Sequence, residues 1–333
     1  MSIGSRTTRT LLAGLIVAAV VFPLSAAATP PVPAPNPVAF SAGTAAGVRY
    51  TANQGNLAEA ARMAQDAGRG GRAAKLRAMA APSGGARFLS FDGRGKGRAV
   101  EVFGDVETAD RVAVLVPGSD TTLDTYQRFR AGAAALQQRL RAEHPRSAVV
   151  AWLGYDTPGT VSTTVLTTGR ADEGATELSH FLAELRGLTR PAARISLLCH
   201  SYGSVVCART TTGPEVTDTV LYGSPGTGAG SVSELPTTAR VWVGRGSDDW
   251  VAHVPHVRLG SMGFGTDPVD PGFGALAFEA GDAGHSDYLR PGTESLDSLA
   301  RIVVGSADTA PVVTTAAASD VLVRPNSSEA SHA

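Results

Sequence analysis

The sequence predicts an α/β fold in which a mostly parallel sheet is covered by helices on both faces. Two patterns carry this prediction. Beyond residue 110, short and near-continuous apolar segments alternate with longer segments whose apolar residues have helical spacing. The chain of 333 residues is also 43% hydrophobic and 18% charged, which is typical of one sizeable globular domain with a well-filled core.

Three strands are expected first, in quick succession: RFLSF (87–91), RAVEVFG (98–104) and RVAVLVPG (111–118). Strands and helices alternate after them. The further strands expected are SAVVAWLG (147–154), ARISLLC (193–199), DTVLYG (218–223) and ARVWVG (239–244). The helices expected in this region cover 125–143, 177–188, a segment from Ser204 onward and 293–304.

The N-terminal region has the pattern of an exported protein. Arg6 and Arg9 precede the apolar stretch 11–21, and the small residues 25–28 suit cleavage by signal peptidase. Twin arginines and a nearby cysteine are missing, so we expect a Sec-type signal and a secreted or cell-envelope protein. A membrane anchor is the alternative, although Pro23 ends the apolar run early.

These patterns divide the chain into five segments. They are a signal peptide (1–28), a Pro-rich linker (29–40), an N-terminal helical segment (41–85), the α/β domain (86–305) and a flexible C-terminal tail (306–333). Within the helical segment, Asn56 followed by Glu59 predicts a helix start, and the glycines of 68–71 predict its end. A second helix is expected over 73–79.

Charge and spacing patterns exclude several classes of partner. The formal net charge is -1, so a nucleic acid or an anionic membrane surface is not expected to bind. No histidine spacing, C-x-x-C pair or phosphate-binding loop predicts a metal or a cofactor. The two cysteines, Cys199 and Cys207, form either one disulfide bridge or two buried thiols.

The stretch CHSYG places Ser201 where a buried strand meets a helix. A strained strand-to-helix elbow exposes a serine as a nucleophile, and it requires small residues two positions before and after that serine. Those residues are Cys199 and Gly203, so the sequence departs from G-x-S-x-G by one small residue. The alternative is a structural serine at a helix start.

The loop after RVAVLV is the candidate oxyanion-binding loop. An elbow needs two backbone N–H donors, one from the residue after the nucleophile and one from the loop after this earlier strand. Tyr202 and Ser119 occupy those positions, and Gly118 would let the backbone approach a substrate closely. The alternative is an ordinary strand-to-helix turn capped by Asp120.

An acid and a base should follow the serine in chain order. The loop RGSDDWV after the strand ARVWVG carries Asp248 and Asp249, and we favour Asp249 because Val251 can anchor the loop two residues later. Asp248 stays open. Of the seven histidines, His285 in DAGHSDYL is the candidate base. The others precede the acid, lie too near it or lie in the tail: His144, His180, His200, His253, His256 and His332.

Strand alternation would direct the side chain of His200 away from Ser201. The segments Tyr155–Gly169 and Trp250–Phe278 could cover the serine. Trp250, Phe264 and Phe273 would then form an apolar wall, or they could anchor the loops to the core.

Several motifs together resemble a known family. They are FDGRGKGRAVEVFGDVETADRVAVLVPGS, AWLGYDTP, CHSYGSVV, GTDPVDPGFGALAF and GHSDYL. Over roughly residues 76–288, the chain is similar to the actinobacterial α/β-hydrolase proteins, many of them exported and formerly of unknown function. The resemblance implies an α/β-hydrolase fold and a triad of Ser201, an aspartate of the SDD loop and His285. It implies little about the substrate.

The sequence therefore predicts an exported serine hydrolase. The most specific expectation is a carboxylic-ester hydrolase that forms an acyl-enzyme at Ser201 and whose partner is a small-molecule or lipid ester. An acyltransferase or a peptidase with the same triad is a near relative of this expectation. A catalytically silent envelope-binding protein on the same scaffold is the alternative from another class, because a fold alone does not decide function.

Overall fold

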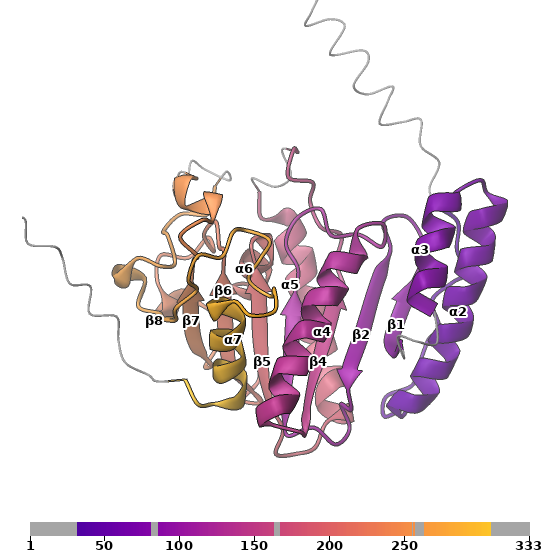
Figure 1. Cartoon of the computed structure of the whole chain (residues 1–333), viewed down its shortest axis with the longest axis horizontal. Helices are drawn as coiled ribbons and strands as arrows, with labels where there is room; N and C mark the ends of the chain where they lie inside the picture. The colour runs from indigo at the N-terminus through magenta and orange to yellow at the C-terminus, as the bar shows by residue number, and fades with distance from the viewer. Residues whose placement is uncertain (1–31, 81–85, 163–166, 255, 257–262, 308–333) are drawn as a thin grey trace, which may run out of the picture.

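The computed structural model describes residues 32–80, 86–162, 167–254, 256 and 263–307 (Figure 1). These residues contain an eight-stranded sheet with the strand order β1-β2-β4-β3-β5-β6-β7-β8. The strands are β1 (Phe88–Asp92), β2 (Arg98–Gly104), β3 (Arg111–Val116), β4 (Ser147–Leu153), β5 (Arg194–His200), β6 (Val216–Tyr222), β7 (Arg240–Gly244) and β8 (Leu276–Ala277). From β4 to β8 every neighbouring pair is parallel, so the prediction of a mostly parallel sheet is confirmed.

Helices cover both faces of this sheet. They are α2 (Ala46–Asp66), α3 (Gly70–Ala80), α4 (Tyr126–Glu143), α5 (Gly169–Leu188), α6 (Tyr202–Cys207) and α7 (Glu294–Val304), with short 3-10 helices η3 (Val232–Glu234), η4 (Trp250–His253) and η5 (Pro271–Phe273). Figure 1 shows α4 and α7 together on the near face. The seven longer strands were predicted, whereas β8 was not, because two half-buried residues are too few to produce a hydrophobic pattern.

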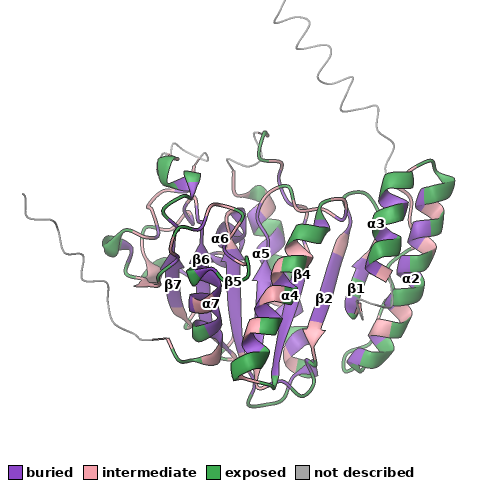
Figure 2. Ribbon diagram, viewed as in Figure 1, coloured by how far each residue is buried: buried purple, intermediate pink, exposed green. Residues whose placement is uncertain are grey.

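The residues of the central strands alternate between two cores. In β3, Val112 and Val114 pack with residues of α5 and α6, whereas Ala113 and Leu115 pack with residues of α4 and α7. Figure 2 shows the central strands buried and the helices buried along one side only. Strands that are apolar on both faces are what a covered parallel sheet requires, and this is why the central strands are continuous apolar runs in the sequence.

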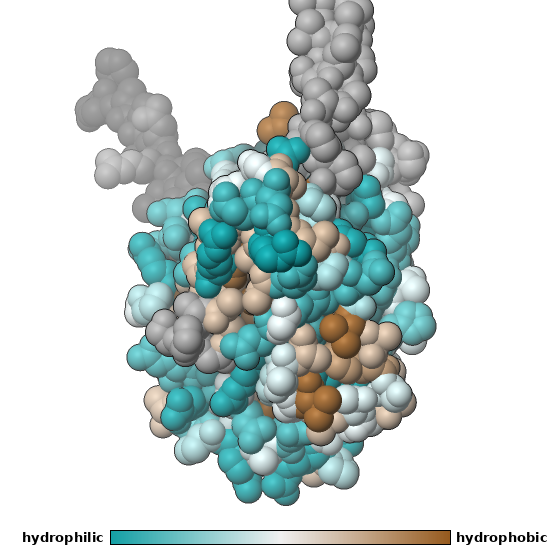
Figure 3. Space-filling model, turned by 90° about the vertical axis from the view of Figure 1, so that its right-hand side faces the viewer, coloured by the Kyte–Doolittle hydropathy of each residue, from teal (hydrophilic) through white to brown (hydrophobic). Residues whose placement is uncertain are grey.

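Helices α2 and α3 form a hairpin (46–80) that packs beside β1. Leu57 and Leu76 of the hairpin share a third core with Phe88 and Phe91 of β1 and with Tyr126 of α4. Figure 3 views the molecule from the hairpin side and shows a mostly hydrophilic outer surface. The hairpin lies at the β1 end of the sheet, opposite to β8 (Figure 1).

The predicted start of the first helix at Asn56 was wrong. Helix α2 begins ten residues earlier, at Ala46, and Asn56 lies inside it and donates to the carbonyl of Asn36. Asn53, one turn earlier, is buried and donates to the carbonyl of Phe88. These inward-facing polar side chains interrupt the apolar spacing, and so they hide the first turns of the helix from a hydrophobic pattern. Helix α3 likewise begins at Gly70, inside the predicted break.

Several predicted segments lie outside the described residues. The signal peptide (1–28) and the C-terminal tail from residue 308 are among them. Within the described residues, no helix is both long enough and apolar enough to cross a membrane.

Candidate functional site

Ser201 lies on a tight turn between β5 and α6. Its backbone has a φ of 52° and a ψ of -126°, in a region that residues with a side chain rarely adopt. A Cβ atom at Gly203 would come within 2.6 Å of the Val116 carbonyl oxygen, so only glycine fits there. The elbow geometry that was predicted for CHSYG is therefore present, including its requirement for a small residue after Ser201.

The position before the elbow that usually holds glycine is Cys199, and it is bonded to Cys207. The two Cα atoms are 6.4 Å apart, and both residues are buried. Of the two alternatives left open by the sequence, the structure has the disulfide bridge. The bridge ties the end of β5 to α6 across the turn that carries Ser201.

A continuous series of hydrogen bonds joins Ser201 to a buried carboxylate. His285 Nε2 is 2.9 Å from Ser201 Oγ, and His285 Nδ1 is 2.9 Å from Asp249 Oδ1. Asp249 is 1% exposed, whereas Asp248 is exposed and contacts Ser247. The structure thus brings together the three favoured residues and leaves Asp248 out of the series.

The carboxylate of Asp249 accepts two further hydrogen bonds besides the one with His285. Oδ1 also accepts from the Val251 backbone N–H at 2.9 Å, and Oδ2 accepts from the Tyr288 hydroxyl at 2.6 Å. Burial alone would raise the pKa of Asp249, but the hydrogen bonds from His285, Tyr288 and Val251 outweigh it and lower the pKa. The carboxylate is therefore ionised at neutral pH and faces the Nδ1 side of His285.

Tyr288 is a hydrogen-bond partner of Asp249 that the sequence analysis missed. Its hydroxyl accepts from the Gly246 backbone N–H at 3.1 Å and donates to Asp249 Oδ2. Burial, and then the bond to Asp249, raises the pKa of Tyr288, so the hydroxyl keeps its proton and remains a donor. In the sequence, Tyr288 differs from other tyrosines only by lying three residues after His285. This spacing does not predict a contact with Asp249 unless the fold of the loop is known.

His200 is the second residue whose role was missed. Its ring packs against that of His285, with 4.7 Å between the two ring centroids. His200 Nε2 is 2.7 Å from the His285 carbonyl oxygen. Burial, and then the nearby His285, lowers the pKa of His200 to about 3, so the ring is neutral and Nε2 carries the proton that it donates to that carbonyl.

The low pKa of His200 predicts a pH-dependent stability. The unfolded chain binds a proton at this residue below about pH 6.5 and the folded protein does not, so stability is lost as the pH falls below that value. Between pH 7 and pH 5 we expect this residue to cost about 2 kcal/mol of the free energy of unfolding. Urea unfolding at the two pH values should show a larger decrease in the wild type than in His200→Gln. Equal decreases in the two proteins would contradict the assignment.

The candidate oxyanion loop lies directly against Ser201. A Cβ atom at Gly118 would come within 2.7 Å of Ser201 Cβ and 3.2 Å of Ser201 Oγ. Ser119 follows Gly118, and Tyr202 is the first residue of α6, where backbone N–H groups have no partner within the helix. The two predicted donors therefore belong to the two segments that meet at Ser201 Oγ.

The aromatic residues of the predicted wall divide into two kinds. Phe264 and Phe273 are buried and anchor their loops to the core. Trp250 is 51% exposed, and its ring centroid is 4.6 Å from that of His285. Of these three residues, Trp250 alone presents an apolar face beside the hydrogen-bonded series. Among the described residues, no group of three or more His, Cys, Asp and Glu side chains could hold a metal ion.

The sequence of this chain is similar to a protein family and to several uncharacterized proteins. A family model described as "Alpha/beta hydrolase" matches residues 92–259, a range that includes Ser201 and Asp249 and ends before His285. An uncharacterized protein of Mycobacterium tuberculosis strain H37Rv is 31% identical over 255 residues, which are 64% of this chain and 38% of the relative. An uncharacterized protein of Mycobacterium bovis is 32% identical over 194 residues, 54% of this chain and 70% of the relative. The chain thus spans well under half of the Mycobacterium tuberculosis relative.

Solved structures with a similar fold include two bacterial hydrolases. The esterase LipW from Mycobacterium marinum is 15% identical, with a TM-score of 0.44 over 75% of this chain and 89% of that chain. A serine hydrolase without a lid from Xanthomonas campestris is 16% identical, with a TM-score of 0.39 over 63% of this chain and 88% of that chain.

Proposed function

The chain belongs to the α/β-hydrolase family whose model matches it, and from this premise we propose that it is an exported serine hydrolase that cleaves carboxylic esters through an acyl-enzyme. One observation carries the proposal: Ser201, on a turn with a φ of 52°, is hydrogen-bonded to His285, which is hydrogen-bonded to the buried Asp249. A serine hydroxyl becomes a useful nucleophile only beside a base that is itself oriented by a third group.

In this proposal the ester is cleaved in two half-reactions. Ser201 Oγ attacks the carbonyl carbon while His285 Nε2 takes its proton, and the same proton passes to the leaving alcohol as the C–O bond breaks. Water then attacks the acyl group on Ser201 and gives a proton to His285. Ser201 Oγ recovers that proton when the carboxylic acid leaves. Throughout both half-reactions, Asp249 Oδ1 accepts a hydrogen bond from the His285 Nδ1–H and stabilises the charged imidazole ring.

The negative oxygen that develops in both half-reactions needs donors. The backbone N–H groups of Ser119 and Tyr202 are proposed for this role, because their segments converge on Ser201 Oγ at Gly118. Donors fixed in place before the reaction stabilise the charge without reorganisation, and each is worth about 100- to 1000-fold in rate in enzymes of this kind.

Burst kinetics test the proposed activity. The full chain, mixed rapidly with p-nitrophenyl esters of different acyl length, should release about one equivalent of p-nitrophenol per Ser201 before the slower steady state, because p-nitrophenol is a good leaving group and acylation is then faster than deacylation. Ser201→Ala should show no burst. Absence of both burst and turnover with the folded wild type would favour a binding protein on a hydrolase scaffold.

Export of the protein is part of the proposal. The disulfide between Cys199 and Cys207 supports it, because such bridges persist in secreted and envelope proteins and are rare in the cytosol. The N-terminal sequence pattern points the same way.

Trp250 should influence which alcohol the enzyme accepts. His285 Nε2 protonates the leaving group in the proposed mechanism, so the Trp250 ring beside His285 lies on the leaving-group side. For Trp250→Ala, we expect kcat/KM to fall about tenfold for esters of bulky apolar alcohols, in line with the loss of about 1–2 kcal/mol of aromatic contact. Methyl esters with the same acyl group should change little. Equal losses for both series would mean that Trp250 does not contact the leaving group.

A further inference from the structure

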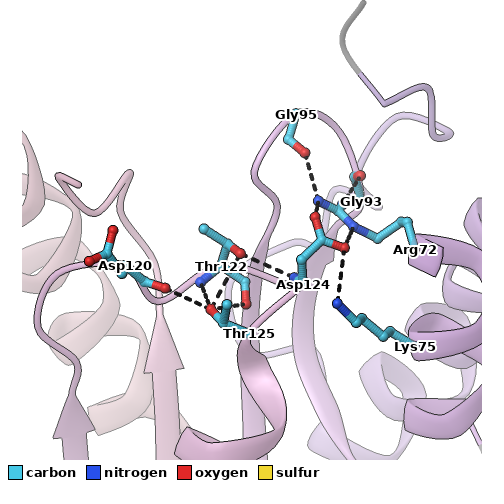
Figure 4. Close-up of polar contacts among 8 residues, drawn as sticks. All are labelled: Arg72, Lys75, Gly93, Gly95, Asp120, Thr122, Asp124 and Thr125. Atoms are coloured by element: carbon cyan, nitrogen blue, oxygen red, sulfur yellow. Dashed lines mark hydrogen bonds and ion pairs between the residues drawn. The ribbon is translucent and has the colours of Figure 1, made fainter. Parts of the chain in front are cut away.

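Arg72 links the N-terminal hairpin to the loop that follows β3. The side chain of Arg72, on α3, is 3% exposed. Its Nε and Nη2 atoms donate to the two carboxylate oxygens of Asp124 at 2.8 and 2.7 Å. The remaining bonds go to the carbonyl oxygens of Gly93 at 3.2 Å and Gly95 at 3.0 Å in the β1–β2 turn (Figure 4). Lys75, one turn along α3, also faces Asp124, at 4.0 Å.

The hairpin lies outside the part of the chain that matches the family. The match begins at residue 92, after both α2 and α3. A fully buried arginine is costly unless its donors are satisfied, and the partners of Arg72 satisfy it through a forked pair and two carbonyls. The contact is therefore a specific connection between the hairpin and the hydrolase domain, in addition to their shared apolar core.

Asp124 belongs to a short segment (119–125) whose members are bonded to one another. The Asp124 N–H donates to Thr122 Oγ1 at 3.1 Å, and the Thr122 N–H donates to Thr125 Oγ1 at 2.9 Å. Thr125 Oγ1 then donates to the Asp120 carbonyl oxygen at 2.7 Å (Figure 4). The series runs from the guanidinium of Arg72 to the carbonyl group of Asp120, the residue that follows Ser119.

Two further contacts hold the same segment in place. The Asp120 N–H donates to the Pro158 carbonyl oxygen at 2.9 Å, and the Leu123 N–H donates to the Lys96 carbonyl oxygen at 3.0 Å. Asp120 itself has a φ of 57°, a conformation that its surroundings must impose on a residue with a side chain. At its other end the segment adjoins Gly118, which touches Ser201. A series of contacts therefore connects the backbone next to Ser119 with Asp124.

We propose that Arg72 is a positioning residue for catalysis, which acts through Asp124 to fix the loop that carries the Ser119 oxyanion donor. The proposal rests on the proposed serine-hydrolase function. It gives the N-terminal hairpin a role in the reaction: the hairpin sets the geometry of one half of the oxyanion site. Arg72 touches no substrate, and its effect reaches the reaction only through the loop.

The test compares two arginines of the same hairpin in the full chain. Arg72→Met removes the forked pair and keeps much of the apolar stem, whereas Arg62→Met removes the exposed ion pairs of Arg62 with Glu59 and Asp66 on α2. For Arg72→Met we expect kcat for a p-nitrophenyl ester to fall about tenfold with KM within about twofold, because a small displacement of a donor weakens transition-state binding most. Arg62→Met should retain wild-type kcat.

A transition-state analogue separates positioning from stability. A trifluoromethyl ketone forms a tetrahedral adduct with the serine, whose oxyanion occupies the same site, so its inhibition constant should rise in Arg72→Met by the same factor as kcat falls. Asp124→Asn should lower kcat less, about threefold. If Arg72→Met fails to fold, the kcat and ketone affinity of Asp124→Asn test the positioning role instead. Arg72→Lys should recover part of the loss, because it keeps the charge but cannot form the fork.

The outcomes distinguish this proposal from the proposed function. A lower melting temperature with unchanged kcat and unchanged ketone affinity in Arg72→Met and Asp124→Asn would overturn the positioning role and leave a purely structural one. Failure of the wild type to turn over any ester or to bind the ketone would instead overturn the serine-hydrolase function itself.

Discussion

Replacing Ser201 or His285 by alanine abolishes nearly all of the proposed ester hydrolysis. Each variant loses about 10⁶-fold in kcat, and the double variant loses no more than either single one, because the nucleophile and its base act as one unit. The structural reason is the 2.9 Å hydrogen bond between Ser201 Oγ and His285 Nε2. Among the described residues, no other side chain is hydrogen-bonded to Ser201 Oγ. Steady-state hydrolysis of a p-nitrophenyl ester measures all three variants.

His200→Gln is the matched control for this experiment. The ring of His200 packs against that of His285 but bonds only to its backbone carbonyl, so the substitution changes a histidine in the same cluster without removing the base. We expect this variant to keep most of the activity. Loss of activity in His200→Gln as large as in His285→Ala would show that the two rings had been assigned to the wrong roles.

The two neighbouring aspartates should differ by several orders of magnitude. Asp249→Asn lowers kcat by about 10⁴-fold, since an amide in place of the carboxylate holds the histidine in the wrong tautomer. Asp248→Asn leaves kcat within about twofold, because Asp248 is exposed and contacts only Ser247 among the bonds found in the structure. The same ester assay measures both variants, and their circular dichroism spectra check that each is folded.

The dependence of kcat on pH in the wild type also reflects the state of Asp249. The pKa of Asp249 is lowered by its bonds to His285, Tyr288 and Val251, so protonation of Asp249 does not limit activity at mildly acidic pH in the wild type. Tyr288→Phe removes one of these bonds and should reduce kcat less than Asp249→Asn does. A larger loss in Asp248→Asn than in Asp249→Asn would contradict the assignment of the acid.

The main elements of the fold could be predicted because their physical causes are local. The central strands are apolar on both faces, so each forms an unbroken run, and the elbow requires small residues at fixed distances from Ser201. The order of acid and base along the chain then pointed to His285 and to the loop with Asp248 and Asp249, in which Val251 favoured Asp249. The small residue expected two positions after Ser201 is Gly203, and its neighbours leave no space for a Cβ atom.

What the sequence did not reveal depends on contacts between distant segments. Tyr288 becomes a partner of Asp249 only when the loops after β7 and before α7 meet, and His200 contacts the His285 carbonyl only when the end of β5 meets the loop before α7. The early start of α2 was hidden because Asn53 and Asn56 face inward and bond to the backbone of other segments. The Cys199–Cys207 bridge could not be chosen over two thiols, because strand and helix geometry together decide the Cα separation of 6.4 Å.

Labelling with a fluorophosphonate tests the central claim most directly, because the probe reacts with a serine only when a base and an oxyanion site activate it. The account predicts one covalent adduct on the folded wild type, located by peptide mass spectrometry on Ser201, with no adduct in Ser201→Ala or His285→Ala. A folded wild type that remains unlabelled, or an adduct that persists in Ser201→Ala, would contradict it.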